Sequence, residues 1–346
     1  MPIVEYTPSR FGNLKEMVSQ VPGPMNLAHR GFVDYYYSTR DWCKLYLYYS
    51  DEGKVIGTLG RELAPFILGS RKITIRIASN WYSLRRGIGG ELYEHSAKSN
   101  LDSVAIMFGG SQKTLDILRH HSWIFMPGIR GFSLNNPYEA VPDSSWWRSA
   151  TKSVIRHLTT HRLPTLASRL PSSVVNEIAV REEKSYSADL LPSHHPFSFH
   201  FTPSLEHLCW RYNLSLPFIR YRLFRVLTHG RTTGFVILSD SPHRIIVAHC
   251  DGDNPSSLAY GVLLSILEAG RHDSEARGVF LACSHSDMQE IFCQFGFHSD
   301  GEDLPFAFRT HPDGLDPSFG TSNWLVNFDW GDNGLSPAFL DPPSTA

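Results

Sequence analysis

The chain has 346 residues, of which 42% are hydrophobic and 19% charged, the composition of a globular protein. Its formal net charge of -2 argues against a general polyanion binder, although it leaves room for local basic patches. No run approaches the ~18 apolar residues that span a bilayer, and no secretory signal is visible at the N-terminus. The chain is longer than one hydrophobic core usually supports, so we expect two domains. We also expect the protein to be cytoplasmic.

The cysteines and histidines favour neither a disulfide framework nor a metal site. The five cysteines are odd in number, widely spread and without a Cys-x-x-Cys pair, so they indicate reduced thiols. Of the 17 histidines, the adjacent pairs His120-His121 and His194-His195 lack a third ligand at helical spacing. We therefore expect no metal ion.

The first half of the chain alternates strand and helix patterns. Two strand-like runs at 43–49 and 54–59 flank a turn that ends in Gly53, which predicts a hairpin. Isoleucines at every second position over 72–78 predict a strand with one buried face and with Arg76 on its other face. The remaining expected elements are a helix from Gly87, a strand at 103–108, a helix at 112–121 and a strand near Ile124.

A glycine turn, Gly87-Ile88-Gly89-Gly90, separates the central strand from the next helix. The first backbone amides of a helix have no intrahelical partner and carry partial positive charge, so they favour an anion. Glycines let the backbone approach closely, and Arg85 and Arg86 add charge. The turn therefore indicates either a phosphate-binding site or a turn that serves packing alone.

Residues 134–202 are rich in proline and predict a connecting region. Within them, the segment 146–170 carries five basic residues and no acidic one. Two interpretations stay open for this segment. It is either a helical linker packed on one domain, or a surface helix that meets an anionic ligand, a partner or lipid headgroups.

The second half repeats the element order of the first at a spacing of roughly 170 residues. The expected elements are strands at 221–227, 233–239, 244–249 and 278–283 and helices at 255–269 and 286–295. The pattern predicts a tandem duplication with an N-terminal domain (1–133), a linker (134–202), a C-terminal domain (203–310) and an extension (311–346).

This order, with a glycine turn after the central strand, resembles the GNAT superfamily of N-acetyltransferases. The acyl-CoA motif of that family, Gln/Arg-x-x-Gly-x-Gly/Ala, falls on Gly87 and Gly89, with Leu84 at the Gln/Arg position. A later signature, Tyr-x-x-x-Gly-Phe, falls on 118–123 as Leu-Arg-His-His-Ser-Trp. In the second half it falls on 292–297 as Phe-Cys-Gln-Phe-Gly-Phe, a closer match.

The resemblance implies an α/β fold of two GNAT-like modules, each a mixed, mostly antiparallel central sheet flanked by helices. It also implies a site for acyl-CoA, in which the strand edge at Ile77, Ala78 and Ser79 binds the pantetheine arm. The residues expected at the CoA diphosphate are Arg85, Arg86, Gly87, Ile88, Gly89 and Gly90.

The corresponding turn of the second half, Asp251-Gly252-Asp253-Asn254-Pro255, carries carboxylates that would repel a diphosphate. Asn254 is expected to cap the next helix, with Pro255 at its first position. We therefore predict one acyl-CoA site, in the N-terminal half.

Two catalytic groups that the resemblance implies are missing. Leu118 stands at the position where the family has a tyrosine that acts as a general acid. Ile75 and Arg76 stand where many relatives carry a glutamate that acts as a base. The candidates that we name in their place for proton transfer or ammonium binding are His249, Asp251 and Asp253. The alternative for these three is a solvated turn with a satisfied histidine.

Several other side chains allow two interpretations. Asn80 and Tyr82 are candidates for orienting a water molecule or the acceptor, and Cys250 is either a nucleophile or a buried strand cysteine. The tyrosines at 35–37, 46, 48 and 49 either line an acceptor groove or pack in the core.

We expect an acyl-CoA-dependent N-acyltransferase that transfers an acetyl group from acetyl-CoA to an amino sugar or another small amine. Two alternatives remain: a non-catalytic acyl-CoA sensor or scaffold, and an aminoacyl-tRNA-dependent transferase of the tandem GNAT-like fold. The second alternative needs a basic RNA-binding face, for which only the segment 146–170 is a candidate. We expect no specific binding of nucleic acid.

Overall fold

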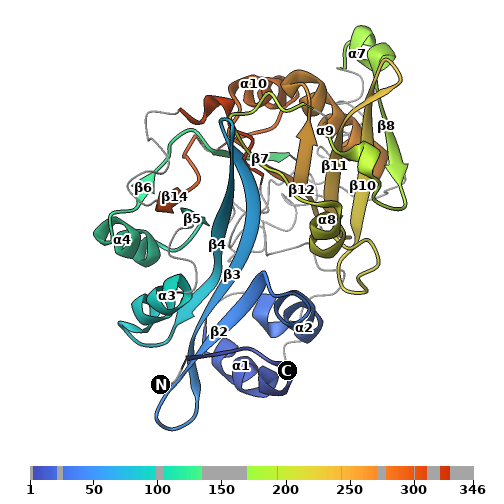
Figure 1. The fold of residues 1–346 in the computed structure, drawn as a ribbon. Coiled ribbons are helices and arrows are strands. Elements are labelled where there is room, and N and C mark those ends of the chain that lie inside the picture. Colours follow the sequence, from blue (N-terminus) through green and yellow to red (C-terminus); the bar gives the residue numbers. More distant parts are fainter. Residues whose placement is uncertain are drawn as a thin grey trace, which may run out of the picture.

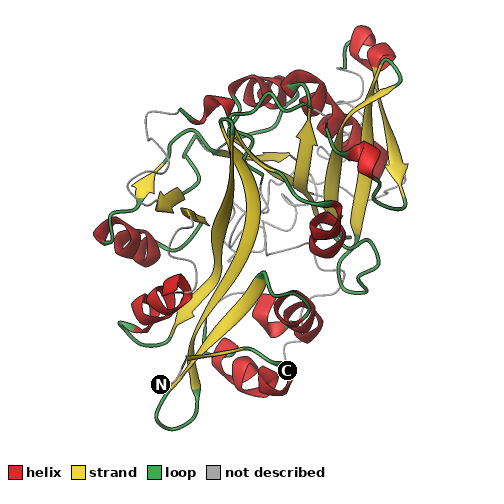
Figure 2. Ribbon diagram, viewed as in Figure 1, coloured by secondary structure: helices red, strands yellow, loops and turns green. Residues whose placement is uncertain are grey.

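The computed structural model describes residues 3–21, 26–98, 104–134, 170–192, 194–242, 244–270, 278–299, 301–309 and 320–327. They form two twisted sheets with helices packed around them (Figure 1, Figure 2). No helix among these residues is both long and apolar enough to cross a membrane. Nearly all of the basic segment 146–170 and most of the predicted extension from 311 lie outside the described residues.

The first sheet has the strand order β1-β2-β3-β4-β5-β14-β6, and β9 pairs with β3. Its strands are β1 (Ile3–Glu5), β2 (Cys43–Tyr49), β3 (Val55–Leu68), β4 (Arg71–Ser83), β5 (Val104–Phe108), β6 (Ile124–Phe125), β9 (Phe199–Phe201) and β14 (Phe306–Arg309). Helices α1 (Phe11–Val18) and α2 (Arg30–Ser38) pack on one face, and α3 (Ile88–Lys98) and α4 (Gln112–His120) on the other.

The second sheet has the strand order β7-β13-β12-β11-β10-β8. Its strands are β7 (Arg130–Leu134), β8 (Ile178–Glu183), β10 (Tyr221–Thr228), β11 (Arg231–Asp240), β12 (Arg244–Gly252) and β13 (Gly278–Cys283). Helices α9 (Pro255–Gly270) and α10 (Ser286–Gln294) cover its outer face. The shorter helices are α7 (Ser172–Glu177), α8 (Leu205–Arg211), η1 (Pro8–Arg10), η2 (Asn26–Ala28), η3 (Ala188–Leu190) and η4 (Thr321–Asn323).

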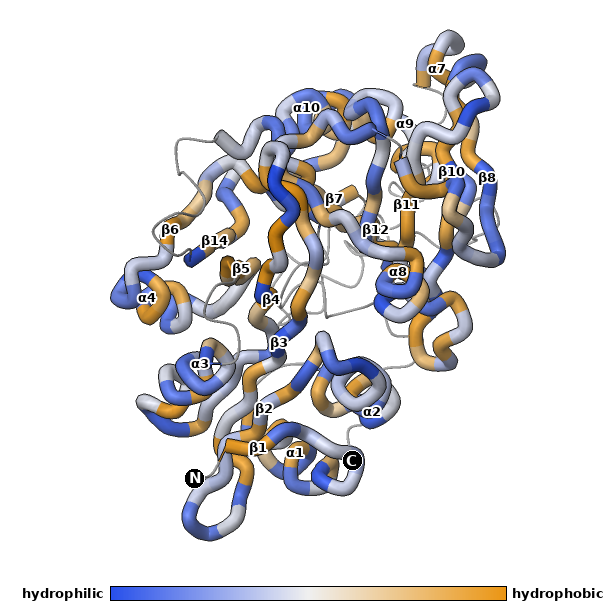
Figure 3. Tube along the Cα trace, in the orientation of Figure 1, coloured by the Kyte–Doolittle hydropathy of each residue, from blue (hydrophilic) through white to orange (hydrophobic). Residues whose placement is uncertain are grey.

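The predicted fold class is confirmed: two mostly antiparallel sheets flanked by helices. Hydrophobic and hydrophilic residues alternate along β4 (Figure 3), as the sequence pattern predicted. The prediction of a single buried face was wrong, however, because Arg76 is only 6% exposed. Helices α3 and α4 cover the face that carries Arg76, and this tertiary contact is not encoded in the period of the strand.

The two halves exchange a strand. Near the C-terminus, β14 inserts between β5 and β6 of the first sheet, whereas β7 from the N-terminal half pairs with β13 of the second. In addition, β8 and β9, from the predicted linker 134–202, are strands of the second and first sheets. The sheets thus cross the boundaries drawn from the sequence, because a strand pattern specifies a strand and not its partner.

The inner faces of both sheets share one hydrophobic core, which contains Leu45 and Ile77 from the first sheet and Leu223 and Ile237 from the second. A buried charged cluster lies beside it. Glu62 of β3 accepts one hydrogen bond from His207 and forms an ion pair with Arg211, both on α8. The modules are therefore joined by apolar packing and by a buried ion pair.

Candidate functional site

The central strands of the first sheet diverge at the residues predicted to bind the pantetheine arm. The parallel pairing of β4 with β5 ends at Ala78 and Met107, although β4 continues to pair with β3 as far as Ser83. A bulge in β4 accompanies this divergence, and Asn80 within it has a φ of 49°. Bulges bend a strand away from its partner. The edge of β4 beyond Ala78 is thereby released from β5.

The glycine turn leads from the end of β4 into the first turn of α3. Gly87 has a φ of 91°, a conformation that favours glycine. Within the described chain, no backbone carbonyl outside α3 accepts a hydrogen bond from the amides of Ile88 and Gly89. These amides are the unpaired donors that an anion requires at a helix start.

Trp81 packs directly against this turn. Its indole Nε1 donates to the carbonyl of Gly89 at 3.1 Å. A Cβ atom at position 89 would lie only 3.0 Å from that nitrogen, so a larger residue there would push against the indole ring. A Cβ atom at Gly57 of β3 would likewise lie 2.7 Å from Ile88. Two glycines thus allow the start of α3 to pack tightly on the sheet.

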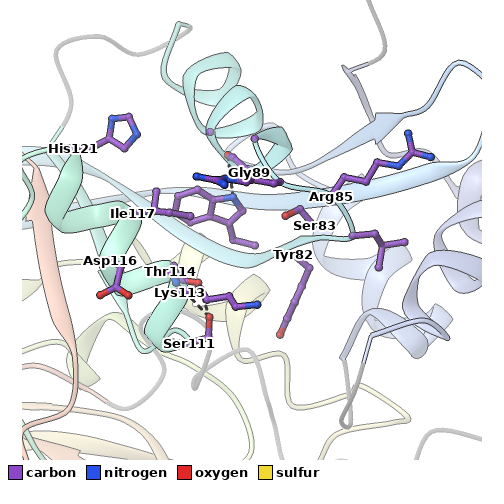
Figure 4. A pocket seen from close by; sticks show the side chains of 15 residues that line it. Tyr82, Ser83, Arg85, Gly89, Ser111, Lys113, Thr114, Asp116, Ile117 and His121 are labelled. Carbon is purple, nitrogen blue, oxygen red and sulfur yellow. Dashed lines mark hydrogen bonds between the residues drawn. The ribbon is translucent and has the colours of Figure 1, made fainter.

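A cavity of about 820 Å³ opens between the glycine turn and α4. Figure 4 shows side chains from α4, including Lys113, opposite Tyr82 and Arg85 from the strand end and the turn. Five of the residues expected at the CoA diphosphate line this cavity: Arg85, Arg86, Gly87, Gly89 and Gly90. Its volume falls within the range of cavities that hold cofactors.

The other predicted CoA-binding residues lie behind the cavity. Ile88 is buried against the sheet, and Ile77, Ala78 and Ser79 lie where β4 leaves β5. None of these four is among the lining residues of the cavity. The α4 residues that line it were missed by the sequence analysis, which included the start of that helix only as a secondary-structure element. Ser111 caps α4 by accepting from the amide of Thr114 at 3.3 Å.

In the second module, the turn that corresponds to the glycine turn is held by hydrogen bonds to protein atoms. The Asp251 carboxylate accepts from the amide of Gly252 at 2.8 Å, and the amide of Asp253 donates to a carbonyl of β11 at 2.9 Å. Asn254 accepts from the amide of Ser257 at 2.9 Å, which confirms the predicted cap. Three amides of this turn, those of Gly252, Asp253 and Ser257, are therefore bound by protein oxygens, and Pro255 at the first position of α9 has no N–H.

The second module also has a divergence between its central strands, and the chain itself fills it. The pairing of β12 with β13 ends at Ile246 and Phe280. Beyond this point, the Asn327 amide accepts from the backbone N–H of Cys250 at 2.9 Å and donates to its carbonyl at 3.2 Å. A cavity of about 10 Å³ lies beside Cys250.

The three candidates for catalysis lie on β12 and the loop after it. His249 is 1% exposed and packs against the rings of Phe201, Tyr212 and Phe235. Burial, assisted by the positive charge of Arg211, lowers the pKa of His249 to about 3. The histidine is therefore neutral near pH 7.

Asp251 is also buried, and its carboxylate lies 3.3 Å from Nδ1 of His195. Neither Asp251, His249 nor Asp253 lines the cavity at the glycine turn. The role assigned to these three in proton transfer or ammonium binding stays a prediction. Cys250 is buried as well, and burial raises the pKa of its thiol well above the usual value.

The tyrosines of α2 lie between the modules. Tyr35 and Tyr36 donate to the backbone carbonyls of Trp210 and Arg211 at 2.9 and 2.7 Å. The hydroxyl of Tyr37 accepts from the Asn80 side chain at 2.7 Å, close to the bulge in β4. These tyrosines therefore pack in the core between the modules. Tyr82, by contrast, lines the cavity.

The cysteines are all free thiols: Cys43, Cys209, Cys250, Cys283 and Cys293. No group of three or more histidine, cysteine or acidic side chains in the described residues is arranged to hold a metal ion.

Comparison with known proteins gives matches at the level of structure alone. No family model matches the sequence, and no curated protein does. Among solved structures, the chain is similar to N-myristoyltransferase from Saccharomyces cerevisiae with bound myristoyl-CoA (10% identity, 94% of this chain and 89% of that one, TM-score 0.58). It is also similar to a tandem GNAT protein from the clavulanic acid biosynthesis pathway (15% identity, 90% and 99%, TM-score 0.53).

A third similar structure is a GCN5-related N-acetyltransferase from Kribbella flavida (12% identity, 89% of this chain and 71% of that one, TM-score 0.51). These similarities extend over both modules. The chain therefore has a tandem GNAT fold.

Proposed function

We propose that this protein is an acyl-CoA-dependent N-acyltransferase with a single CoA site, the cavity at the glycine turn. The observation that carries the proposal is the position of this cavity. It is lined by the glycine turn at the start of α3 and by Trp81, Tyr82 and Ser83, which belong to the part of β4 beyond its pairing with β5. The tandem GNAT fold supports the proposal, and the similar N-myristoyltransferase holds an acyl-CoA.

In this proposal, the CoA diphosphate binds at the amides of Ile88 and Gly89, and Arg85, Arg86 and Lys113 balance its charge. The pantetheine arm follows the edge of β4 into the divergence. A backbone amide there donates to the thioester carbonyl, so that it stabilises the oxyanion that develops during attack. The acceptor amine attacks the thioester carbon directly, and the CoA thiolate leaves as the amine loses its proton.

We assign the acceptor to a small amine, such as an amino sugar, and the acyl group to acetyl. Asp251 is the first candidate for binding the ammonium group or taking its proton. If it has that role, Asp251→Asn lowers turnover more than CoA affinity. Equal turnover in this variant would remove Asp251 from the mechanism.

The second module serves as a partner to the first and not as a second CoA site. Two observations support this assignment: its turn donors are bound by protein oxygens, and Asn327 occupies the divergence between its central strands. Titration of the full chain with CoA should accordingly give one site per chain.

The test is release of free thiol from acetyl-CoA in the presence of a panel of amines that includes amino sugars. We expect thiol release that depends on the amine, and loss of this activity in Gly87→Ala. CoA binding without thiol release across the panel would favour the non-catalytic sensor. The second candidate is favoured by Leu118, which is buried and has no hydroxyl group that could protonate the leaving thiolate.

A further inference from the structure

Four buried polar side chains gather on the α2 side of the first sheet, next to the point at which β4 leaves β5. They are Tyr37 of α2, Thr58 of β3, and Ser79 and Asn80 of β4, and each is at most 2% exposed. We call them the polar cluster. The side chains of α2 and β4 beside it, such as Phe32, belong to the hydrophobic core that the modules share. Polar groups in such a core are stable only when they are hydrogen-bonded.

Asn80 lies at the centre of the polar cluster. Its side-chain amide donates to the Tyr37 hydroxyl at 2.7 Å, and its backbone carbonyl accepts from the Thr58 hydroxyl at 2.9 Å. The Tyr37 hydroxyl also lies 3.5 Å from the hydroxyl of Ser79. With a φ of 49°, Asn80 has a left-handed backbone, which persists in a residue other than glycine when the surrounding structure holds it. The hydrogen bonds to Tyr37 and Thr58 therefore fix the bulge of β4.

The polar cluster is also tightly packed. Gly60 of β3 pairs with Ser79 across the sheet. A Cβ atom at Gly60 would lie 2.6 Å from the Ser79 hydroxyl oxygen and 2.8 Å from that of Tyr37. Real contacts of a Cβ atom are longer than this, so the space between these groups does not admit even one methyl group.

The polar cluster and the cavity at the glycine turn lie on opposite faces of the sheet. Helices α2 and α3 pack on these two faces (Figure 1). Trp81, the residue after Asn80, belongs to the α3 face, where its indole donates to the carbonyl of Gly89. A thioester whose CoA part lies in the cavity, and which reaches the divergence of β4 and β5, thus directs its acyl group toward α2. There the acyl group meets the polar cluster.

A long hydrocarbon chain does not fit this environment. To extend toward α2 it would have to separate the Tyr37 hydroxyl from the Asn80 amide and place methylene groups against both. Hydrocarbon cannot replace the lost hydrogen bond, and disrupting a buried one is costly. An acetyl group has only a methyl group beyond its carbonyl carbon, so it ends before this obstacle.

We propose that the polar cluster closes the acyl pocket and restricts the donor to acyl-CoA with a short acyl group, with Tyr37 as the residue that sets the limit. This inference rests on the proposed function and gives a structural reason for its acetyl group. The fold by itself leaves the acyl length open, since one similar structure holds myristoyl-CoA and another is an N-acetyltransferase.

The test is calorimetric titration of the full chain with acetyl-CoA and with octanoyl-CoA. We expect the wild type to bind octanoyl-CoA about tenfold more weakly, the cost of disrupting one buried hydrogen bond. Tyr37→Phe keeps the ring and removes the hydroxyl, so it should reduce this difference to about threefold. Tyr37→Leu, which removes the ring as well, should make the two affinities about equal. Acetyl-CoA affinity should stay the same in both variants.

Tyr36 provides a matched control on the same helix. It is also buried, but its hydroxyl donates to the carbonyl of Arg211 in the second module, away from the polar cluster. Tyr36→Phe should therefore keep the wild-type preference of about tenfold for acetyl-CoA. If Tyr37→Leu does not fold, as judged by circular dichroism, the comparison of Tyr37→Phe with Tyr36→Phe decides the role of Tyr37.

Equal or tighter binding of octanoyl-CoA by the wild type would overturn this inference and leave the proposed function intact. A wild-type preference that Tyr37→Phe retained in full would overturn the assignment to Tyr37. The same conclusion would follow if Tyr36→Phe reduced the preference as much as Tyr37→Phe. Failure of both donors to bind the wild type would contradict the proposed function itself.

Discussion

Ser122 and Gly296 hold equivalent positions at the ends of α4 and α10, and both adopt a left-handed backbone, with φ of 59° and 88°. In each turn, the amide of the next residue, Trp123 or Phe297, donates to the carbonyl five residues earlier, at 3.0 and 3.1 Å. The two halves thus form the same helix ending from different residues. This agreement supports the tandem duplication that the element order predicted.

The equivalence predicts a stabilising substitution. The Cβ atom of Ser122 causes steric strain in the left-handed region, and glycine has no such strain. Ser122→Gly should therefore raise the free energy of unfolding by about 1 kcal/mol. Urea unfolding measures the change. Ser122→Ala, which keeps the Cβ atom, is the matched control and should give no gain. Equal stability of the glycine and alanine variants would show that this turn is not strained.

The contact between Asn327 and Cys250 predicts a large effect from a small change. Asn327→Ala removes both side-chain hydrogen bonds to the buried backbone of Cys250, so it should lower the free energy of unfolding by about 2–4 kcal/mol. Asn323→Ala, at an exposed position of the same segment, should change it by less than about 0.5 kcal/mol. Chemical denaturation of both variants tests the contact, and similar small losses would rule it out.

The ion pair between the modules should be sensitive to the loss of one partner. Glu62→Gln leaves the Arg211 guanidinium buried without its carboxylate, and it should cost about 3–5 kcal/mol of stability. Glu16→Gln, which removes the exposed ion pair with Lys54, should cost less than about 1 kcal/mol. If thermal and denaturant unfolding gave the same small change for both, Glu62 would not tie the modules together.

Buried His249 should make the fold sensitive to acid. Its pKa is about 3 in the folded chain and about 6.5 in an unfolded one, so the unfolded state binds more protons between these values. The stability contributed by neutral His249 is therefore complete above about pH 6.5 and is lost as the pH falls toward 3. At pH 5 the loss amounts to about 2 kcal/mol.

The variant His249→Leu isolates this effect. It should reduce the loss of stability between pH 7.5 and pH 5 by about 2 kcal/mol, as measured by urea unfolding at each pH. His195 acts in the opposite direction. Although burial lowers its pKa, the hydrogen bond and charge of Asp251 outweigh burial and raise it, so its contribution is present at low pH and lost as the pH rises. Because His195 is present in both proteins, its contribution cancels when the variant is compared with the wild type. If the stability of the variant and of the wild type changed equally with pH, His249 would not be the source of the acid sensitivity.

Much of the fold could be predicted from local patterns. The alternation over 72–78 and the helical spacing after Gly87 arise from single elements with a buried face, and the structure contains β4 and α3 there. The pairing of β14 with β5 could not be predicted, because four residues of strand pattern do not specify a partner some 200 residues away.

The candidate site divides in the same way. The glycine turn could be found because glycine is required by the local backbone at Gly87. The place of Lys113 in the wall of the cavity depends on how α4 lies relative to α3, which no local pattern contains. Arg76 was assigned to a polar face, and only the packing of Tyr93 over it shows that it is buried.

The central claim is that the glycine turn of the N-terminal module binds acyl-CoA, and calorimetric titration with acetyl-CoA tests it most directly. We predict one site per chain in the wild type and an affinity loss of about tenfold in Gly87→Ala, where alanine strains a backbone with φ of 91°. Gly230→Ala, with a φ of 77° in a hairpin of the second module, imposes the same strain elsewhere and should bind normally. No binding at high micromolar acetyl-CoA, or equal binding by Gly87→Ala and the wild type, would contradict the claim.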